Sequence, residues 1–109
     1  MNEPMRGEVY WVNLDPTIGS EISKPRPAVI VSINVLNARR NTVIVIPLSS
    51  KGVHRPPLVV DVRSAGEDST ARIDQIRTID KARLRERKGV LNGADLSAID
   101  DALRVVVGL

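Results

Sequence analysis

Residues 19 to 32 read Gly-Ser-Glu-Ile-Ser-Lys-Pro-Arg-Pro-Ala-Val-Ile-Val-Ser, and this stretch places an arginine at the entrance of a strand. Ala28 to Val31 form a short apolar run, which is typical of a strand in the core. Pro25 fixes its own φ, and Pro27 pushes Arg26 toward extended geometry, so the arginine side chain leaves the backbone in a restricted direction. A guanidinium fixed at the mouth of a sheet suits phosphate binding. An ordinary surface arginine in a proline-rich turn would show the same pattern.

Short strands separated by turns are predicted on both sides of this stretch. They cover Glu8 to Leu14, Arg26 to Ser32, Thr42 to Leu48, Leu58 to Val62, Thr70 to Ile76 and Arg85 to Val90. Thr42 to Leu48 is apolar on both faces and is therefore expected to be central, with Pro47 marking the point where ladder pairing fails. Asn34 to Asn41 and Asp80 to Leu84 each have room for one helical turn.

Only the C-terminus shows a clear helical pattern. Asn92 can cap a helix, Asp95 follows near its positive end, and Gly108 is the expected stop. One apolar stripe runs along the predicted helix at Leu96, Ile99, Leu103 and Val106. Several strands followed by one helix predict a mainly β protein, either a small antiparallel barrel or a strongly curved sheet, with the C-terminal helix packed on it.

The composition is that of one small domain spanning residues 1–109. The chain has no Phe, one Trp and one Tyr, so the core must be mostly Val, Ile and Leu. Cysteine is absent, which excludes a disulfide framework, thiol catalysis and a cysteine-built zinc site. The N-terminus does not resemble a targeting signal, and no apolar run approaches the length of a membrane span, so a cytoplasmic protein is expected.

The charge pattern favours an anionic partner. The formal net charge is +3, and arginines outnumber lysines by 12 to 4. The planar guanidinium grips phosphate or carboxylate with two hydrogen bonds, so the bias toward arginine fits either group. Nucleic acid and an acidic protein segment both remain open as partners.

The residue types available for catalysis are few. The only histidine, His54, lies in a polar loop, so one chain holds neither a histidine pair nor a Ser-His-Asp triad. The carboxylates are scattered, and their spacing does not resemble an oxygen-ligand metal site. An enzyme built on this chain would rely on Arg, Ser, Thr or an isolated acid, and it would need no metal or other cofactor.

The segments beside the strands supply candidates for such chemistry. Asp15 to Pro25 is a loop of about eleven residues, a length typical of binding loops. Ser49 and Ser50 follow the apolar third strand, where their hydroxyls can lie beside Arg26 at one rim, although serines also favour plain strand-ending turns. The period of two that relates Arg83, Arg85 and Arg87 would align them on one face of an extended segment, either as an RNA contact or as a solvated edge.

Short motifs distributed along nearly the whole chain resemble the MazF/PemK family of toxin endoribonucleases. In order, they are Arg6-Gly7-Glu8-Val9-Tyr10, Leu14-Asp15-Pro16, Gly19-Ser20-Glu21, Arg26-Pro27, Asp74-Gln75-Ile76-Arg77-Thr78-Ile79-Asp80-Lys81, Ala102-Leu103 and Gly108-Leu109. Each motif is short, and their shared order makes the match specific. The resemblance implies an SH3-like, CcdB-like antiparallel β-barrel that works as a homodimer and cuts single-stranded RNA at short sequences. It also implies a MazE-like antitoxin that lays an acidic C-terminal segment along the RNA groove.

By the same resemblance, the catalytic residues are Arg26, Glu21 and a hydroxyl after the third strand. That hydroxyl is Thr in many relatives and is Ser49 here, which lacks the methyl group that restricts χ1. The RNA-binding candidates are Gln75, Arg77, Ser50, Lys24 and Arg83.

RNA carries its own nucleophile in the 2′-hydroxyl, so the protein need only orient it and stabilise charge on the phosphorane, which Arg26 can do. With only two aromatic residues, base stacking should be limited. Two alternatives remain open: a non-catalytic, CcdB-like toxin of the same fold that binds gyrase, and a plain RNA-binding barrel.

Overall fold

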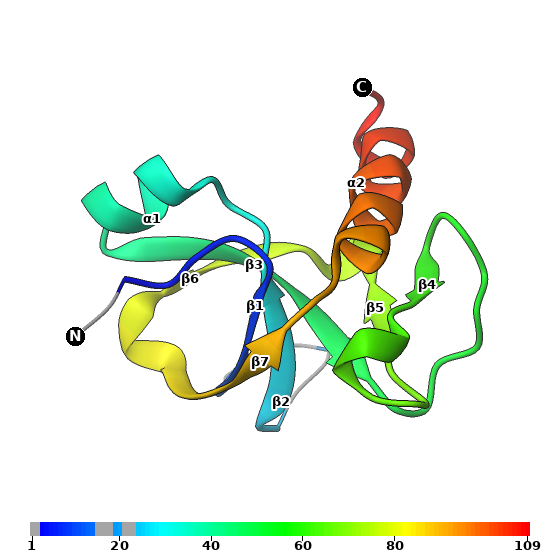
Figure 1. Ribbon diagram of the computed structural model, residues 1–109, viewed down its shortest axis with the longest axis horizontal. Coiled ribbons are helices and arrows are strands. Elements are labelled where there is room, and N and C mark those ends of the chain that lie inside the picture. The colour runs from blue at the N-terminus through cyan, green and yellow to red at the C-terminus, as the bar shows by residue number, and fades with distance from the viewer. Residues whose placement is uncertain (1–2, 15–18, 21–23) are drawn as a thin grey trace.

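The computed structural model describes residues 3–14, 19–20 and 24–109, and their arrangement is shown in Figure 1. The described residues form the strands β1 (Glu8–Val12), β2 (Arg26–Ile30), β3 (Thr42–Ser49), β4 (Val59–Asp61), β5 (Thr70–Arg72), β6 (Arg77–Asp80) and β7 (Leu84–Val90). The helices are α1 (Asn34–Arg39) and α2 (Gly93–Val107), and the 3-10 turns are η1 (Arg63–Ala65), η2 (Ile73–Gln75) and η3 (Lys81–Arg83).

The strands pair antiparallel in the order β4-β5-β3-β2-β1-β7, with β6 also paired to β3. β3 is central, as its two apolar faces predict. Within the described residues, β4 and β7 end this path and no ladder joins them. The prediction of an antiparallel sheet carrying a C-terminal helix is therefore confirmed, whereas closure into a barrel stays a prediction.

The side of β3 away from β2 is shared by two strands. From Leu48 to Val45, β3 advances three residues, while the chain opposite advances six, from Ala71 to Arg77. The surplus is taken up by η2, so the predicted single strand from Thr70 to Ile76 is wrong beyond Arg72. Pro47 lies between the part of β3 that pairs with β5 and the part that pairs with β6, and neither of these ladders includes it. On its other side, Pro47 is in register with Ala28 of β2.

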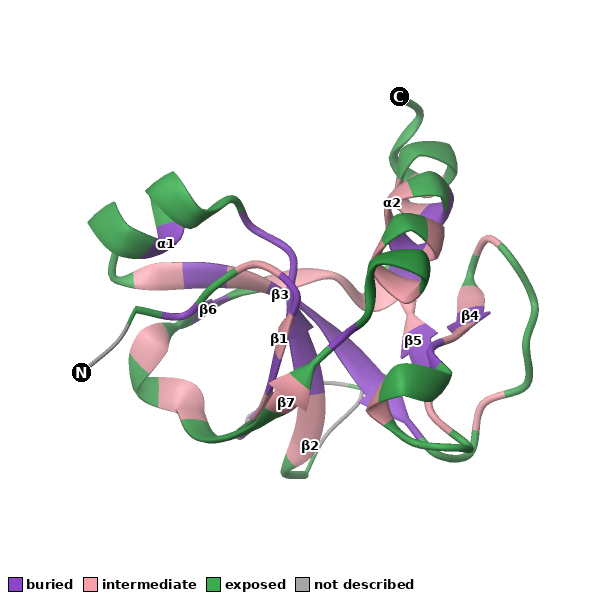
Figure 2. Cartoon of the chain, in the orientation of Figure 1, coloured by how far each residue is buried: buried purple, intermediate pink, exposed green. Residues whose placement is uncertain are grey.

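The core divides into two clusters because the middle strands are buried on both faces, as the purple of β3 in Figure 2 illustrates. Along β2, Val29 belongs to a cluster beneath α2, while Ala28 and Ile30 belong to the cluster on the opposite face. Successive side chains of a strand point to opposite faces, so an unbroken apolar run serves both clusters.

The C-terminal helix follows its sequence signals. The Asn92 side chain caps it by accepting a hydrogen bond from the Asp95 amide, and Gly108 ends it in the left-handed conformation with φ 79°. Ile99 and Ala102 are buried against the first cluster. All of these features confirm the predicted helix.

The alignment of Arg83, Arg85 and Arg87 on one face was expected only for an extended segment, and Arg83 lies in the helical turn predicted from Asp80 to Leu84. Arg83 lies in η3 rather than in β7, so it does not share an extended face with Arg85 and Arg87. Asp80 caps this turn by accepting a hydrogen bond from the Ala82 amide, which favours a turn over continued strand.

Candidate functional site

Two surface hollows flank the C-terminal end of β3. The first, here called the Arg26 hollow, has a volume of about 430 Å³ and is lined by Trp11, Pro25, Arg26, Pro27, Leu48, Ser49, Ser50, Ala65, Gly66, Glu67, Asp68, Ser69 and Lys88. The second, the Gln75 hollow, has a volume of about 340 Å³ and is lined by Leu14, Ser20, Pro47, Asp74, Gln75, Ile76 and Arg77. From β3, Pro47 contributes to the Gln75 hollow, whereas Leu48 and Ser49 contribute to the Arg26 hollow.

Arg26 is the first residue of β2, as the flanking prolines predict. It is in register with Val12 of β1, and both flanking prolines line the same hollow. The strand ladder and the two rings thus fix the backbone from which the guanidinium extends. Ser49 and Ser50 also line the Arg26 hollow, so the structure brings this arginine and both predicted hydroxyls to one site.

Ser49 is held on two sides. The residue is 9% exposed, its Oγ accepts a hydrogen bond of 3.1 Å from the Lys51 amide, and its carbonyl accepts one of 3.0 Å from Thr70 Oγ1. Because the backbone amide donates to Oγ, the hydroxyl proton can point away from Lys51 and donate to a ligand. Ser50 is exposed by comparison.

The wall opposite β3 is formed by residues 65–69, which begin at the last residue of η1. The turn is tied to the start of α2, where the Ser64 amide donates to Asp95 Oδ2 at 2.8 Å. Lys88 Nζ donates to the Ala65 carbonyl at 3.2 Å and so links the wall to β7. Glu67 and Asp68 bring two carboxylates to a hollow that also holds Arg26 and Lys88, so both signs of charge line it.

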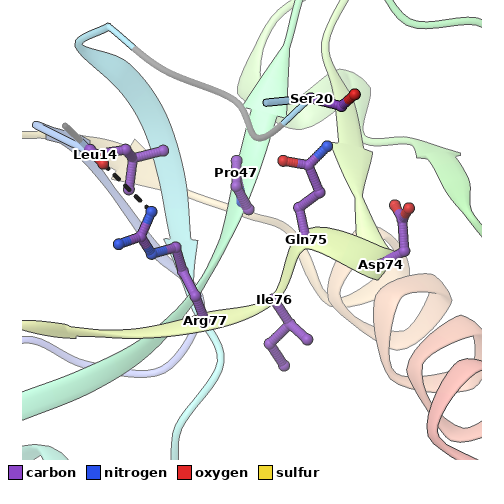
Figure 3. A pocket seen from close by; sticks show the side chains of 7 residues that line it. All are labelled: Leu14, Ser20, Pro47, Asp74, Gln75, Ile76 and Arg77. Carbon is purple, nitrogen blue, oxygen red and sulfur yellow. Dashed lines mark hydrogen bonds between the residues drawn. The ribbon is translucent and has the colours of Figure 1, made fainter. Parts of the chain in front are cut away.

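The Gln75 hollow is built by the surplus residues opposite β3. Figure 3 shows the Asp74 and Gln75 side chains extending to one side of their segment while Ile76 points the other way. Arg77 Nη1 donates to the Leu14 carbonyl at 3.3 Å, which holds the arginine against the end of β1. The structure therefore brings the predicted pair Gln75 and Arg77 together, in a hollow separate from that of Arg26.

Two other predicted site residues, Lys24 and Arg83, do not line these hollows. Lys24 is exposed with φ 70°, and Arg83 donates from η3 to the Asn13 carbonyl at 3.2 Å. Glu21 lies outside the described residues. The histidine expected to be a solvated loop residue, His54, is exposed, and its Nδ1 accepts a hydrogen bond of 3.0 Å from the Asp61 amide.

Sequence reasoning gave no site role to Trp11 and Lys88, which line the Arg26 hollow. Trp11 was predicted only as a strand residue. Its register partner is Pro27, next to Arg26, and that pairing is a signal available only once β1 and β2 are aligned. The contribution of Lys88 depends on the long-range pairing of β7 with β1, which the local pattern does not reveal.

Arg87, another of the basic residues, belongs to a cluster of polar side chains on β1 and β7. Glu8 Oε2 pairs with Arg87 Nε at 2.6 Å, and Glu8 Oε1 accepts hydrogen bonds from Tyr10 and from the Met5 amide. Burial raises the pKa of Glu8, but these hydrogen bonds outweigh it and the net pKa is lowered. Burial, followed by the bond to the Glu8 carboxylate, raises the pKa of Tyr10. Arg87 is thus engaged in joining two strands.

Among residues 3–14, 19–20 and 24–109, no three His, Asp or Glu side chains gather in a way that would hold a metal ion. The helices in this part of the chain are not long and apolar enough to cross a membrane.

Comparisons with known proteins agree on one family. Residues 5–107 match the family model described as PemK-like, MazF-like toxin of type II toxin-antitoxin system. A Staphylococcus epidermidis protein named Endoribonuclease MazF is 34% identical over 95% of this chain and 91% of its own. An endoribonuclease from mycobacterial species, solved in complex with its cognate antitoxin, superposes with a TM-score of 0.82 at 26% identity, covering 97% of this chain and 96% of that one. MazF from Deinococcus radiodurans shares the fold, with a TM-score of 0.86 at 22% identity over the whole of both chains.

Proposed function

The chain belongs to the PemK-like, MazF-like family of type II toxins and is a homologue of endoribonuclease MazF, and from this premise we propose that it cuts single-stranded RNA at short sequences without a metal ion. The observation that carries the proposal is the gathering of Arg26, Ser49 and Ser50 around one hollow at the end of β3. A non-catalytic, gyrase-binding toxin of the same fold needs no such arrangement of a cation and hydroxyls.

The reaction uses the substrate's own nucleophile. The ribose 2′-oxygen loses its proton to a base and forms a bond to the adjacent phosphorus, while the bond from phosphorus to the 5′-oxygen breaks and that oxygen takes up a proton. The products are a 2′,3′-cyclic phosphate and a 5′-hydroxyl. Glu67 and Asp68 are the carboxylates that line the Arg26 hollow within the described residues, while Glu21, the acid assigned by resemblance, lies outside them.

Arg26 stabilises the negative charge that develops on the phosphorane. A guanidinium remains protonated under ordinary conditions, so it acts as a donor and a charge, not as the base. Its preorganisation by the strand ladder matters because a donor already in place needs no reorganisation during the reaction. Removing one such donor typically costs about 10²- to 10³-fold in rate.

Ser49 donates its hydroxyl hydrogen either to a phosphate oxygen or to the leaving 5′-oxygen. Support comes from its hydrogen bonds: the Lys51 amide already donates to Oγ, which leaves the hydroxyl hydrogen available to act as a donor. The Thr70 hydroxyl fixes the Ser49 carbonyl and so limits movement of this group. Ser50, which is exposed on the same rim, contributes to substrate binding.

The Gln75 hollow holds a neighbouring nucleotide. The amide of Gln75 offers both donors and acceptors to a base edge, and Arg77 supplies a cation for the backbone. Lys24 and Arg83 lie outside both hollows and contribute at most long-range attraction to phosphate. Because β3 separates the two hollows, an RNA strand that occupies both crosses the end of this strand.

The protein works as a homodimer and is inhibited by a MazE-like antitoxin with an acidic C-terminal segment. The related mycobacterial endoribonuclease has been solved with its cognate antitoxin, and structures of a MazE-MazF complex are known for the Deinococcus protein. Acidic side chains would pair with the basic groups of the RNA-binding surface and occlude it.

Cleavage of a long RNA by purified protein tests the proposal. Cleavage should persist in EDTA, and the new 5′ ends should accept a phosphate from a kinase without prior phosphatase treatment. Arg26→Ala should nearly abolish cutting, while the matched change Arg39→Ala, on the exposed surface of α1, should not. An RNA with a 2′-deoxy residue 5′ to the scissile bond should resist. Cutting of that RNA at the same bond, or loss of activity in EDTA, would refute the mechanism.

A further inference from the structure

The side chains of Trp11 and Lys88 form a feature of the Arg26 hollow that the chemistry above does not use. Lys88 Nζ lies 5.7 Å from the centroid of the Trp11 ring, within the range of a cation-π contact. Both residues line the hollow that holds Arg26 and Ser49. The tryptophan is 39% exposed, so part of its side chain is accessible to a ligand.

The pairing of β1 with β2 and β7 places both residues in one wall of the Arg26 hollow. Trp11 is in register with Pro27, so the two side chains are cross-strand neighbours on one face, immediately beside Arg26. β7 advances two residues, from Gly89 to Arg87, where β1 advances only one, from Val9 to Tyr10. Lys88 is therefore the extra residue of a β-bulge, a device that redirects a side chain and often occurs beside active sites.

The charges of the hollow favour a nucleobase over a second phosphate at its centre. Glu67 and Asp68 line the hollow together with Arg26 and Lys88, so a phosphate beyond the one bound by Arg26 would meet carboxylates. A neutral base does not suffer this repulsion, and every base presents a flat face that can stack on an aromatic ring. Carboxylates also accept hydrogen bonds from amino groups of bases.

We propose that Trp11 is the stacking platform for a nucleobase next to the scissile phosphate, with Lys88 holding the ring in place through its cation-π contact. This inference rests on the proposed function, because it places the base beside the phosphate held by Arg26. It assigns to the one tryptophan a contact that is largely independent of base identity, whereas hydrogen bonds elsewhere read the sequence.

The chain offers a direct probe, since Trp11 is its only tryptophan. The ligand is a short RNA containing the mapped cleavage site, with a 2′-deoxy residue that prevents cutting. Stacking should quench the fluorescence of wild-type protein as this RNA is added. Trp11→Leu should weaken binding about 10-fold or more by fluorescence anisotropy, and Trp11→Phe should retain most of the affinity. Tyr10→Leu, the same kind of change on the opposite face of β1, is the matched control and should bind normally.

An abasic residue placed in turn at each position of the RNA separates stacking from a structural role of the ring. One abasic position should weaken binding to the wild-type protein yet add nothing to the loss in Trp11→Leu, because both changes remove the same contact. If Trp11→Leu binds as the wild type does, or if its effect adds to that of every abasic position, the stacking proposal is wrong even when RNA is still cut through Arg26. If the RNA quenches Trp11 but Arg26→Ala cuts the matching all-ribose RNA as fast as the wild type does, stacking stands and the proposed cleavage mechanism fails.

Discussion

Replacing Gly52 by alanine tests whether the loop after β3 holds Ser49 in place. Gly52 does not adopt a left-handed φ, so the effect is steric. A Cβ there would lie 2.3 Å from Thr70 Oγ1, whereas such contacts essentially never fall below 3.0 Å. Thr70 is buried and its Oγ1 donates to the Ser49 carbonyl, so the clash must displace the group that anchors the serine.

The expected loss of folding free energy in Gly52→Ala follows from two costs. Overpacking a well-filled site costs about 1–3 kcal/mol, and weakening a buried hydrogen bond costs about 0.5–1.5 kcal/mol. The lower chain entropy of alanine in the unfolded state returns about 0.4–1 kcal/mol. A net loss of about 2 kcal/mol should lower Tm by roughly 8 °C in a domain of this size. Displacement of a catalytic group on this scale should also slow cleavage on the order of 10- to 100-fold.

Calorimetry and a single-turnover cleavage assay measure the two effects. Gly93→Ala is the matched control, since a Cβ there meets open space, and it should leave both Tm and cleavage near those of the wild type. In a Thr70→Ala background the clash with Oγ1 is gone, so the additional cost of Gly52→Ala should fall by about 1 kcal/mol. A Gly52→Ala protein that loses stability but cuts RNA at the wild-type rate would refute the idea that this loop positions Ser49.

Ser49→Thr should preserve cleavage while Ser49→Ala lowers it by about 10-fold or more; equal rates for the Ala variant would move the catalytic hydroxyl elsewhere, with Ser50 the next to test. The lowered folded-state pKa of Glu8 contributes stability above the ordinary value of 4.5 that is lost as the pH falls through the folded value. Glu8→Gln should therefore flatten the acid side of a plot of Tm against pH, and an unchanged slope would show that the carboxylate is not stabilised in this way. Light scattering at micromolar concentration should show a homodimer, and a purely monomeric protein would contradict the proposed assembly.

The sequence predicted the elements whose signals are local. The prolines around Arg26 and the caps of α2 at Asn92 and Gly108 depend on neighbouring residues, and the structure has them as expected. The turn at η2 was missed because the alternation of Ala71 and Ile73 fits a strand, while the mismatch in length against β3 is visible only when both paired strands are known. The wall of the Arg26 hollow combines Trp11 with Lys88 through a bulge, and local periodicity carries no information about such pairing.

The extra residues opposite β3 also suggest how the RNA sequence preference of such a protein can change without a change in its sheet. Ile73 is buried and its amide bonds to the Leu58 carbonyl at 2.9 Å, while β6 resumes at Arg77. Asp74 and Gln75, between these anchors, belong to no strand, so substituting them does not alter the alignment of any two strands. A library randomised at these two codons should yield stable proteins with altered cleavage preferences, so recognition can be changed in this segment without disturbing the sheet.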